Sequence, residues 1–410
     1  MSELDLHFDG LKPPVRITDP DVVMPLLAPA FRQWPFKEAP VDTAVAPFAM
    51  IGPAEDGVKW RLTTPLGEKE EVLRDPIDGI CDLIVEISWE RLRSRPDLLC
   101  LHAAAVPFGD RLVLFPNTRR AGKSLLSATL ARRGFPVFTD DFIPLAVDPV
   151  TRVISGVANG IAPRLRLPVP ETLAEDHAAW IYDHITSRNK RYGYLSEIDL
   201  PLSGTEMPVG AIVLLDRDME MAGPPQLSKV GADEAIAAVV KQNFGRQVHA
   251  GAILTITEVI AMSVPVMRLT YHDVDAAAEL LSQTPALKNL PAARISAEGR
   301  PTPDRLAPVG TARPEPPEPF DMGLTFARVP GYTEVETDQT VYLASARGMT
   351  IQRLNPVSVM IWKLMEEPIS GEDIVAVLAE VFPDVAPETL QGDTRTALRY
   401  LIKDGLVQVS

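Results

Sequence analysis

The chain contains little cysteine and no long apolar run. Its two cysteines, Cys81 and Cys100, show neither the spacing of metal ligands nor a disulfide framework, which is typical of a reducing compartment. No window approaches the roughly eighteen consecutive apolar residues that a transmembrane helix needs. The N-terminal residues are acidic and lack the basic and apolar regions of a secretory signal. We therefore expect a cytoplasmic protein that neither crosses nor binds a membrane.

Basic charge is also scarce. The chain has 40 Lys and Arg against 55 Asp and Glu, a formal net charge of −15. Binding to nucleic acid depends on clustered Lys and Arg side chains against phosphates, so no general nucleic-acid-binding role is expected. The histidines form no cluster with ligand spacing, so no structural zinc is expected either. With 410 residues, 46% of them hydrophobic and 23% charged, the composition is that of a globular protein of two or three domains.

What the sequence does contain is a strand–loop–helix segment around Gly122-Lys123-Ser124. An apolar run at 112–115 is typical of a buried strand, and the residues after Ser124 have the apolar spacing of a helix. Such a junction directs backbone N–H groups and a lysine at a phosphate. Asn117 replaces the first glycine of the phosphate-loop pattern, and asparagine tolerates left-handed backbone angles. We therefore predict a nucleotide-binding loop that consists of Asn117, Thr118, Arg119, Arg120, Ala121, Gly122, Lys123, Ser124 and Leu125.

Lys123 and Ser124 would carry the chemistry of this loop. Lys123 would bridge the β- and γ-phosphates as negative charge develops during transfer, and Ser124 would offer its hydroxyl to Mg²⁺. The helix dipole disfavours a lysine at a helix N-terminus, so a functional role explains Lys123 better than a surface position does. The alternative is a loop that has kept its shape but lost ATP, with Arg119 and Arg120 binding another anion.

Two adjacent carboxylates follow this segment. Asp140 and Asp141 come after an apolar run at 135–139, which we predict to be a strand. Neighbouring residues of a strand point to opposite faces, and burying two unpaired carboxylates is costly. We therefore expect one aspartate to serve a metal ion and the other to accept a proton. The alternative is an exposed acidic turn.

The patterning divides the chain into four parts. Residues 1–98 combine short extended pieces with one amphipathic helix, as in a mixed α/β lobe, and residues 99–284 alternate strands and helices as in an α/β core. Residues 285–320 contain nine prolines and few large apolar side chains, which predicts a mobile linker. Residues 321–410 have extended pieces, then three helices and a last strand, which predicts a winged-helix-like module.

Residues 99–284 resemble the catalytic domain of HPr kinase/phosphorylase. The resemblance is carried by Leu101-His102-Ala103, Gly109-Asp110, Gly122-Lys123-Ser124, Arg132-Arg133-Gly134 and Asp140-Asp141. It implies a P-loop kinase core of the HPr kinase and phosphoenolpyruvate carboxykinase type, which uses ATP and Mg²⁺ to phosphorylate a serine hydroxyl. The sequence departs from the family at residues 118–121, where the family has a glycine-rich loop.

The resemblance also implies roles for single residues. Asp140 would take the proton of the acceptor serine, and Asp141 would hold Mg²⁺ together with Ser124, although the residues alone leave the order of the two aspartates open. His102, which by itself would most simply be a core histidine, would take part in phosphate contact or acid–base chemistry. The implied catalytic residues are therefore Asp140, Asp141, His102 and Lys123.

Five further cations have two interpretations. They could clamp phosphates or an acidic peptide, but solvated surface charge explains each of them more simply. They are Arg164 and Arg166 on a candidate strand, and Arg188, Lys190 and Arg191 in a polar loop.

Residues 321–410 resemble the PqqD family, the domain that recognises the leader of ribosomally made and modified peptides. This resemblance implies strand addition, in which the peptide pairs with an exposed sheet edge beside a helix. The strand at 341–344 and the helix at 394–401 are the candidates, and Trp362 is expected in the core. The resemblance is carried by Arg353-Leu354-Asn355, Ile361-Trp362-Lys363-Leu364, Tyr400-Leu401-Ile402 and Asp404-Gly405-Leu406.

The two resemblances together predict an ATP-dependent kinase for a serine or other hydroxyl of a ribosomally made precursor peptide or small protein. The linker would let the tethered peptide reach the ATP site at a raised effective concentration. Two alternatives stay open: a non-catalytic nucleotide- or peptide-binding adaptor, and a kinase for a carrier protein or small molecule. The resemblance also allows a homo-oligomer.

Overall fold

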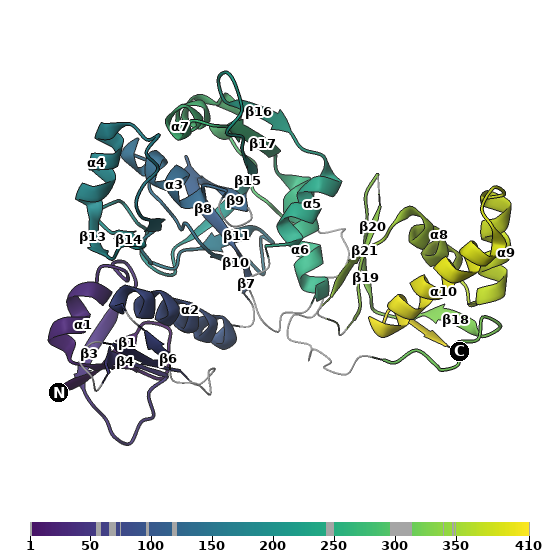
Figure 1. Ribbon diagram of the computed structural model, residues 1–410, viewed down its shortest axis with the longest axis horizontal. Coiled ribbons are helices and arrows are strands. Elements are labelled where there is room, and N and C mark those ends of the chain that lie inside the picture. The colour runs from purple at the N-terminus through teal and green to yellow at the C-terminus, as the bar shows by residue number, and fades with distance from the viewer. Residues whose placement is uncertain are drawn as a thin grey trace. The chain divides into compact units, whose positions relative to one another are not determined.

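The computed structural model describes residues 2–54, 59–64, 71–73, 75–95, 98–116, 121–242, 250–295, 314–338, 340–346, 348 and 350–409. The chain divides into two compact units (Figure 1). Unit 1 comprises Met1–Val230, Lys241–Arg246 and Ser263–Ile295, and unit 2 comprises Gly231–Val240, Gln247–Met262 and Ser296–Ser410. Of the predicted loop residues, Asn117, Thr118, Arg119 and Arg120 lie outside the described residues.

Unit 1 begins with a six-stranded sheet in the order β3-β1-β2-β4-β5-β6, in which only β2 and β4 pair in parallel. Helix α2 (Pro76–Ser94) starts at Asp75, whose side chain accepts a hydrogen bond from the backbone of Ile77. Four isoleucines of this helix, Ile77, Ile80, Ile84 and Ile87, are buried in the core of this lobe. The other elements are β1 (Glu3–Phe8), β2 (Val15–Thr18), α1 (Pro20–Leu27), β3 (Phe36–Pro40), β4 (Ala49–Pro53), β5 (Trp60–Thr63) and β6 (Glu71–Leu73).

An eight-stranded sheet forms the centre of unit 1. Its strands run in the order β16-β17-β15-β11-β10-β7, and β9 pairs with both β15 and β8. β9, β15 and β17 are parallel and almost continuously apolar, which is typical of strands buried on both faces. The strands are β7 (Leu99–Leu101), β8 (Ala103–Phe108), β9 (Arg111–Pro116), β10 (Ile143–Val147), β11 (Ile154–Val157), β15 (Glu206–Arg217), β16 (Gln226–Lys229) and β17 (Val266–Tyr271).

Two helices, α3 (Lys123–Arg132) and α7 (Val274–Gln283), pack on this sheet. Leu126 and Leu130 of α3 share one hydrophobic core with Val113 of β9, Val213 of β15 and Ala277 of α7. Because α3 follows β9 directly, the packing of this core fixes where the first turn of α3 lies at the end of the strand. The predicted strand–loop–helix segment is therefore present at its two described ends.

The expected strand at 135–139 is not a regular strand. Only Thr139 forms an isolated bridge, with Ala105 of β8, and the segment contacts its neighbours through single backbone hydrogen bonds such as Val137 N–H to the Asp199 carbonyl. One edge of β8 pairs with β9 along its whole length, and residues 138 and 139 hydrogen-bond to the other edge only at Ala105, so they form no continuous ladder with it. A smaller sheet, β12-β14-β13, completes unit 1. Its elements and the remaining helices of the unit are β12 (Arg164–Arg166), α4 (Glu175–His184), β13 (Ile185–Arg188), β14 (Tyr192–Leu195) and the 3₁₀ turn η1 (Pro285–Leu287).

Unit 2 contains two three-stranded sheets, β22-β18-β23 and β19-β20-β21, with a common core around the fully buried Trp362 and Phe326. Asn355 and Ser370 cap α8 and α9, and each accepts a hydrogen bond from a backbone N–H three residues ahead. The elements are β18 (Thr325–Arg328), β19 (Thr333–Glu336), β20 (Val341–Ala344), β21 (Ile351–Arg353), α8 (Pro356–Leu364), β22 (Ile369–Ser370), α9 (Gly371–Val381), α10 (Pro387–Lys403) and β23 (Val407–Val409).

The division of the chain departs from the predicted boundaries in two places. Helix α5 (Ala232–Val240) and most of α6 (Ala250–Ser263) fall inside the predicted 99–284 core, but they belong to unit 2. The predicted linker at 285–320 starts too early, because Leu287 and Leu290 are buried in the core of unit 1. It also ends too late, because Phe320 is buried in the core of unit 2. Of the helices that the structure describes, none has both the length and the apolar character needed to cross a membrane.

Candidate functional site

The site begins at the junction between β9 and α3. Gly122 is the N-cap of α3 and has a φ of 91°, in the left-handed region where glycine is favoured. A Cβ atom at this position would lie only 2.6 Å from the hydroxyl of Tyr271, so glycine is also required by close approach. The Leu126 N–H donates to the Gly122 carbonyl at 2.9 Å and starts the helix. The loop end is thus held by strand, helix and Tyr271 together.

Lys123 occupies the first helical position and is buried, with 8% of its surface exposed. Its Nζ lies 3.1 Å from Nε2 of His102. Burial lowers the pKa of Lys123, and the nearby carboxylates of Asp141 and Asp140 partly oppose this effect. Negative charge stabilises a buried lysine at the positive end of a helix, so this position is suited to a phosphate.

His102 lies between β7 and β8 and connects the lysine to a carboxylate. Its backbone N–H donates to the carbonyl of Gln242 at 2.6 Å, and its Nδ1 lies 3.2 Å from Oδ1 of Asp141. When a charged Lys123 donates to Nε2, the ring proton is on Nδ1 and faces Asp141. The structure therefore places Lys123, His102 and Asp141 in one chain of contacts.

Asp140 points into the interior, with 6% of its surface exposed. It accepts a hydrogen bond from the backbone N–H of Arg164 at 3.1 Å and another from the hydroxyl of Ser124. Burial, and then the charge of Asp141, raise the pKa of Asp140 to about 7, although both hydrogen bonds act in the opposite direction. A positive charge next to this carboxylate would stabilise its ionised form.

Asp141 has the opposite environment. Its side chain is 41% exposed and contacts His102 and Arg164, whose Nη2 lies 3.8 Å from Oδ2. The two adjacent aspartates therefore differ in exposure and in partners: Asp140 contacts the helix-start serine, and Asp141 contacts the histidine and the arginine. Neither is part of an exposed acidic turn.

Arg164 contacts the site, whereas the sequence favoured solvated surface charge at this position. It is not solvated surface charge, because its guanidinium stacks over Tyr192 at 5.0 Å and contacts Asp141. Behind it, the Cys81 thiol and the Tyr194 hydroxyl form a buried hydrogen bond of 3.1 Å. The spacing of Arg164 and Arg166 places both on the same face of a strand, and it does not say which of the two contacts the aspartates.

The other predicted cations do not join the site. Arg166, Arg188, Lys190 and Arg191 are exposed. Arg188 lies over Tyr182, and Arg191 pairs with Asp78 at 3.3 Å. Their interpretation as solvated charge agrees with these positions. Tyr271 at the loop was not singled out, because only the tertiary structure brings it close to residues 150 positions earlier.

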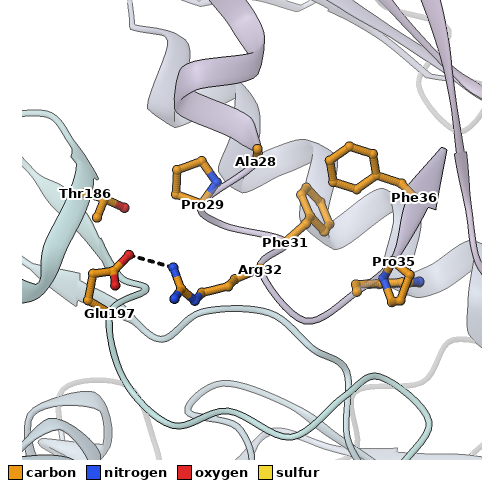
Figure 2. A pocket seen from close by; sticks show the side chains of 9 residues that line it. Ala28, Pro29, Phe31, Arg32, Pro35, Phe36, Thr186 and Glu197 are labelled. Carbon is orange, nitrogen blue, oxygen red and sulfur yellow. Dashed lines mark hydrogen bonds and ion pairs between the residues drawn. The ribbon is translucent and has the colours of Figure 1, made fainter. Parts of the chain in front are cut away.

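A separate pocket of about 490 Å³ lies elsewhere in unit 1 (Figure 2). Figure 2 shows aromatic and proline side chains around it, and an ion pair of 2.6 Å between Arg32 and Glu197 at its side. None of the residues around Lys123 contributes to it. The lining residues are Ala28, Pro29, Phe31, Arg32, Trp34, Pro35, Phe36, Thr186 and Glu197.

In unit 2, the position of β20 changes the prediction for peptide binding. The strand at 341–344 lies between β19 and β21 and is paired on both sides, so it has no free edge for strand addition. The edges of this sheet are β19 and β21. One face of the sheet is held by Asp233 of α5, which accepts hydrogen bonds from Tyr342 at 3.0 Å and from Arg353 at 2.9 Å.

Fold and site together define a mixed α/β protein with a buried lysine and a carboxylate pair at a strand–helix junction. Its C-terminal part is a PqqD domain, because residues 340–407 match the family model described as Coenzyme PQQ synthesis protein D (PqqD). Among solved structures, the chain is similar to the HPr(Ser) kinase/phosphatase from Coxiella burnetii, with 16% identity over 42% of this chain and 85% of that chain and a TM-score of 0.20. No curated protein matches the chain.

Both predicted resemblances thus have a counterpart in the comparisons. The PqqD resemblance is confirmed over residues 340–407. An HPr kinase is a structural neighbour, but its low TM-score gives no support to any statement about activity. Only the residues of this chain can therefore support phosphotransfer.

Proposed function

We propose that the protein is an ATP-dependent kinase that phosphorylates a serine hydroxyl of a precursor peptide bound to its PqqD domain. The observation that carries this proposal is the buried Lys123 at the start of α3, 3.1 Å from His102 and next to the aspartate pair. Phosphoryl transfer needs little covalent chemistry from the protein. It needs cations on the phosphates, a proton acceptor for the attacking hydroxyl and accurate positioning, and this cluster has the groups for all three.

The triphosphate would lie over the N-terminus of α3. Backbone N–H groups of the first turn and the ammonium of Lys123 would donate to its oxygens. Burial lowers the pKa of Lys123, and a bound phosphate would favour the charged lysine again. The sequence departure at residues 118–121 does not affect Gly122, Lys123 and Ser124, which make the closest approach.

The residues also fit Mg²⁺, with Asp140 as the metal-side aspartate. The hydroxyl of Ser124 and the carboxylate of Asp140 are hard oxygen ligands that already contact each other. Among the residues described, no group of three or more His, Cys, Asp and Glu could hold a metal ion alone, so phosphate oxygens would complete the ligand set. Bound Mg²⁺ neutralises charge on the phosphate oxygens.

This assignment reverses the order that the resemblance implied and makes Asp141 the base. Its exposed carboxylate can reach a substrate, whereas Asp140 is buried. The acceptor hydroxyl would give its proton to an Oδ of Asp141 while its oxygen bonds to the γ-phosphorus and the bond to the β-phosphate oxygen breaks. His102 and Arg164 would hold Asp141 in place for this step.

The PqqD domain would supply the substrate. A peptide that adds to β19 or β21 would satisfy the backbone groups of that edge strand. Binding on the same chain as the kinase site raises the effective concentration of the acceptor, so the site itself can bind it weakly. This arrangement would give a reason for one chain to combine a nucleotide site with a PqqD domain.

The test is incubation of the full chain with ATP, Mg²⁺ and a short precursor peptide encoded next to its gene. A mass gain of one phosphate on a serine is expected, together with an ATP-dependent rise in melting temperature. The same peptide without its leader should react at least about tenfold more slowly at equal concentration. Absence of both the mass gain and the melting shift would favour the adaptor, and equal rates without the leader would favour a small-molecule or carrier-protein kinase.

A further inference from the structure

A second cation lies beside the predicted nucleotide loop, on strands that the loop itself does not include. Arg217 is the last residue of β15, and its register partner on the parallel strand β17 is Tyr271. β9, which leads into the loop, is parallel to β15 as well. The carboxyl ends of all three strands therefore meet at one edge of the sheet, where open α/β sheets bind their ligands.

Both residues approach the loop closely. The Tyr271 hydroxyl donates to the Ala121 carbonyl at 3.2 Å. The Cδ of Arg217 lies 4.0 Å from the position that a Cβ of Gly122 would take. The Asp218 N–H donates to the Tyr271 carbonyl at 2.9 Å and ties the ends of β15 and β17 together. Arg217 is thus held at the loop by the sheet.

One nitrogen of the Arg217 side chain has no hydrogen-bond acceptor among the described residues. This nitrogen, Nε, is buried. The two neighbouring carboxylates are used elsewhere: Asp216 accepts from Thr270, and Asp218 accepts from the backbone of Glu220. A buried donor without an acceptor is costly, and an anionic ligand on the loop would supply the acceptor.

The charge of the site points to the same ligand. Lys123 contacts His102 on one side of the loop, and burial lowers the pKa of Lys123. A triphosphate has several negative charges and needs more than one cation. Arginine stays protonated at any physiological pH, and its planar fork matches phosphate oxygens.

We propose that Arg217 is a nucleotide-binding residue whose guanidinium donates to the phosphate chain of the nucleotide, with Tyr271 holding the loop beside it. This inference depends on the proposed nucleotide site and adds a residue to it. It also states which part of the nucleotide Arg217 binds, namely the polyphosphate and not the base. It also assigns Arg217 to binding, whereas Lys123 and Asp141 act in the transfer itself.

The experiment measures dissociation constants of the full chain for ATP with Mg²⁺ and for inorganic tripolyphosphate. Arg217→Ala should raise both constants by about tenfold or more, and Arg217→Lys should raise them less, because lysine keeps the charge but not the fork. Arg133→Ala is the matched control, since Arg133 lies at the other end of α3 and pairs with Glu279.

The possible outcomes separate this inference from the function on which it depends. If the wild-type chain binds neither ligand, the nucleotide site and the role of Arg217 both fall. If it binds ATP but Arg217→Ala binds both ligands as tightly, only the inference is overturned. If Arg217→Ala lost affinity for ATP but not for tripolyphosphate, the inference would also be overturned, because the contact would then be to the nucleoside. An unchanged melting temperature without ligand shows that the variant is folded.

Discussion

The site of unit 1 and the PqqD domain of unit 2 are built from different kinds of residue. In unit 1 the site depends on a few polar side chains from separate segments, namely His102, Lys123, Asp140 and Arg164. In unit 2 the family match covers one continuous stretch, residues 340–407, with an apolar core around Trp362. A family model follows such a continuous apolar pattern even without any catalytic group. A catalytic site has no such pattern, so its evidence must come from contacts.

The sharpest way to test this contrast is to remove one side chain from the site of unit 1. Lys123→Ala should lower the rate of phosphotransfer by about a thousandfold or more, because a cation at the developing negative charge contributes strongly in a site shielded from water. Peptide affinity should stay unchanged. The measurement is the initial rate of phosphopeptide formation, with Lys229→Ala as the control, since Lys229 is an exposed lysine on β16. A Lys123→Ala variant with wild-type activity would rule out the site.

In unit 2, no single residue should have such an effect on chemistry, but one should matter for stability. The side chain of Asp233 is 12% exposed, and it binds Tyr342 and Arg353 on adjacent strands. Asp233→Ala should lower the free energy of unfolding by about 2 kcal/mol, because the buried Tyr342 hydroxyl loses a charged acceptor and keeps only the backbone carbonyl of residue 233. Denaturant unfolding measures the loss. The exposed Asp338, changed to Ala, is the control, and equal stability of the two variants would show that α5 does not support the sheet.

The same contrast explains which features were predictable from the sequence. Signals within a few residues were reliable: Asn355 and Ser370 cap their helices, and the isoleucines of α2 are buried. Gly122-Lys123-Ser124 also lies at the start of a helix that follows a strand, with Gly122 as the N-cap. These features depend on the order of neighbouring residues and on local hydrogen bonds, both of which a sequence displays directly.

Features that depend on long-range packing were not predictable. The contact of Arg164 with Asp141 and the contact of Tyr271 with Ala121 both join segments far apart in the chain, and so does the assignment of α5 to unit 2. The central position of β20 likewise follows from its pairing with β19 and β21 and not from its own residues. The spacing of residues along a chain says nothing about such partners.

A smaller effect is expected from pH, again within unit 1. The pKa of Asp140 is raised to about 7 from its ordinary value of 3.8, so the folded state binds a proton more tightly than the unfolded state. Stability should therefore fall as the pH rises from about 4 to 7. Asp140→Asn keeps the acceptor for Arg164 and Ser124 but has no charge, so it should be more stable than wild type at pH 8, by about 1–2 kcal/mol, and similar at pH 4.

Thermal unfolding at pH 4 and pH 8 measures this difference, and Mg²⁺ should stabilise the wild type at pH 8 more than the variant. The exposed Asp148 provides a control of opposite sign, because hydrogen bonds from the backbone and side chain of Thr151 lower its pKa. Asp148→Asn should lose stability at pH 8. If Asp140→Asn followed the wild type at both pH values, Asp140 would not be a buried, uncompensated carboxylate.

The smallest effect should come from the ion pair at the pocket of Figure 2. Arg32 and Glu197 are 43% and 45% exposed, so water screens their interaction. Glu197→Gln should change the free energy of unfolding by less than about 0.5 kcal/mol and leave the phosphotransfer rate unchanged. The pocket has volume and aromatic walls. The cluster around Lys123 has instead the buried charge and the carboxylates that the proposed phosphoryl transfer needs. A loss of activity in Glu197→Gln, with KM for the peptide raised and folding intact, would place the acceptor in this pocket and extend the site of unit 1 into its N-terminal lobe.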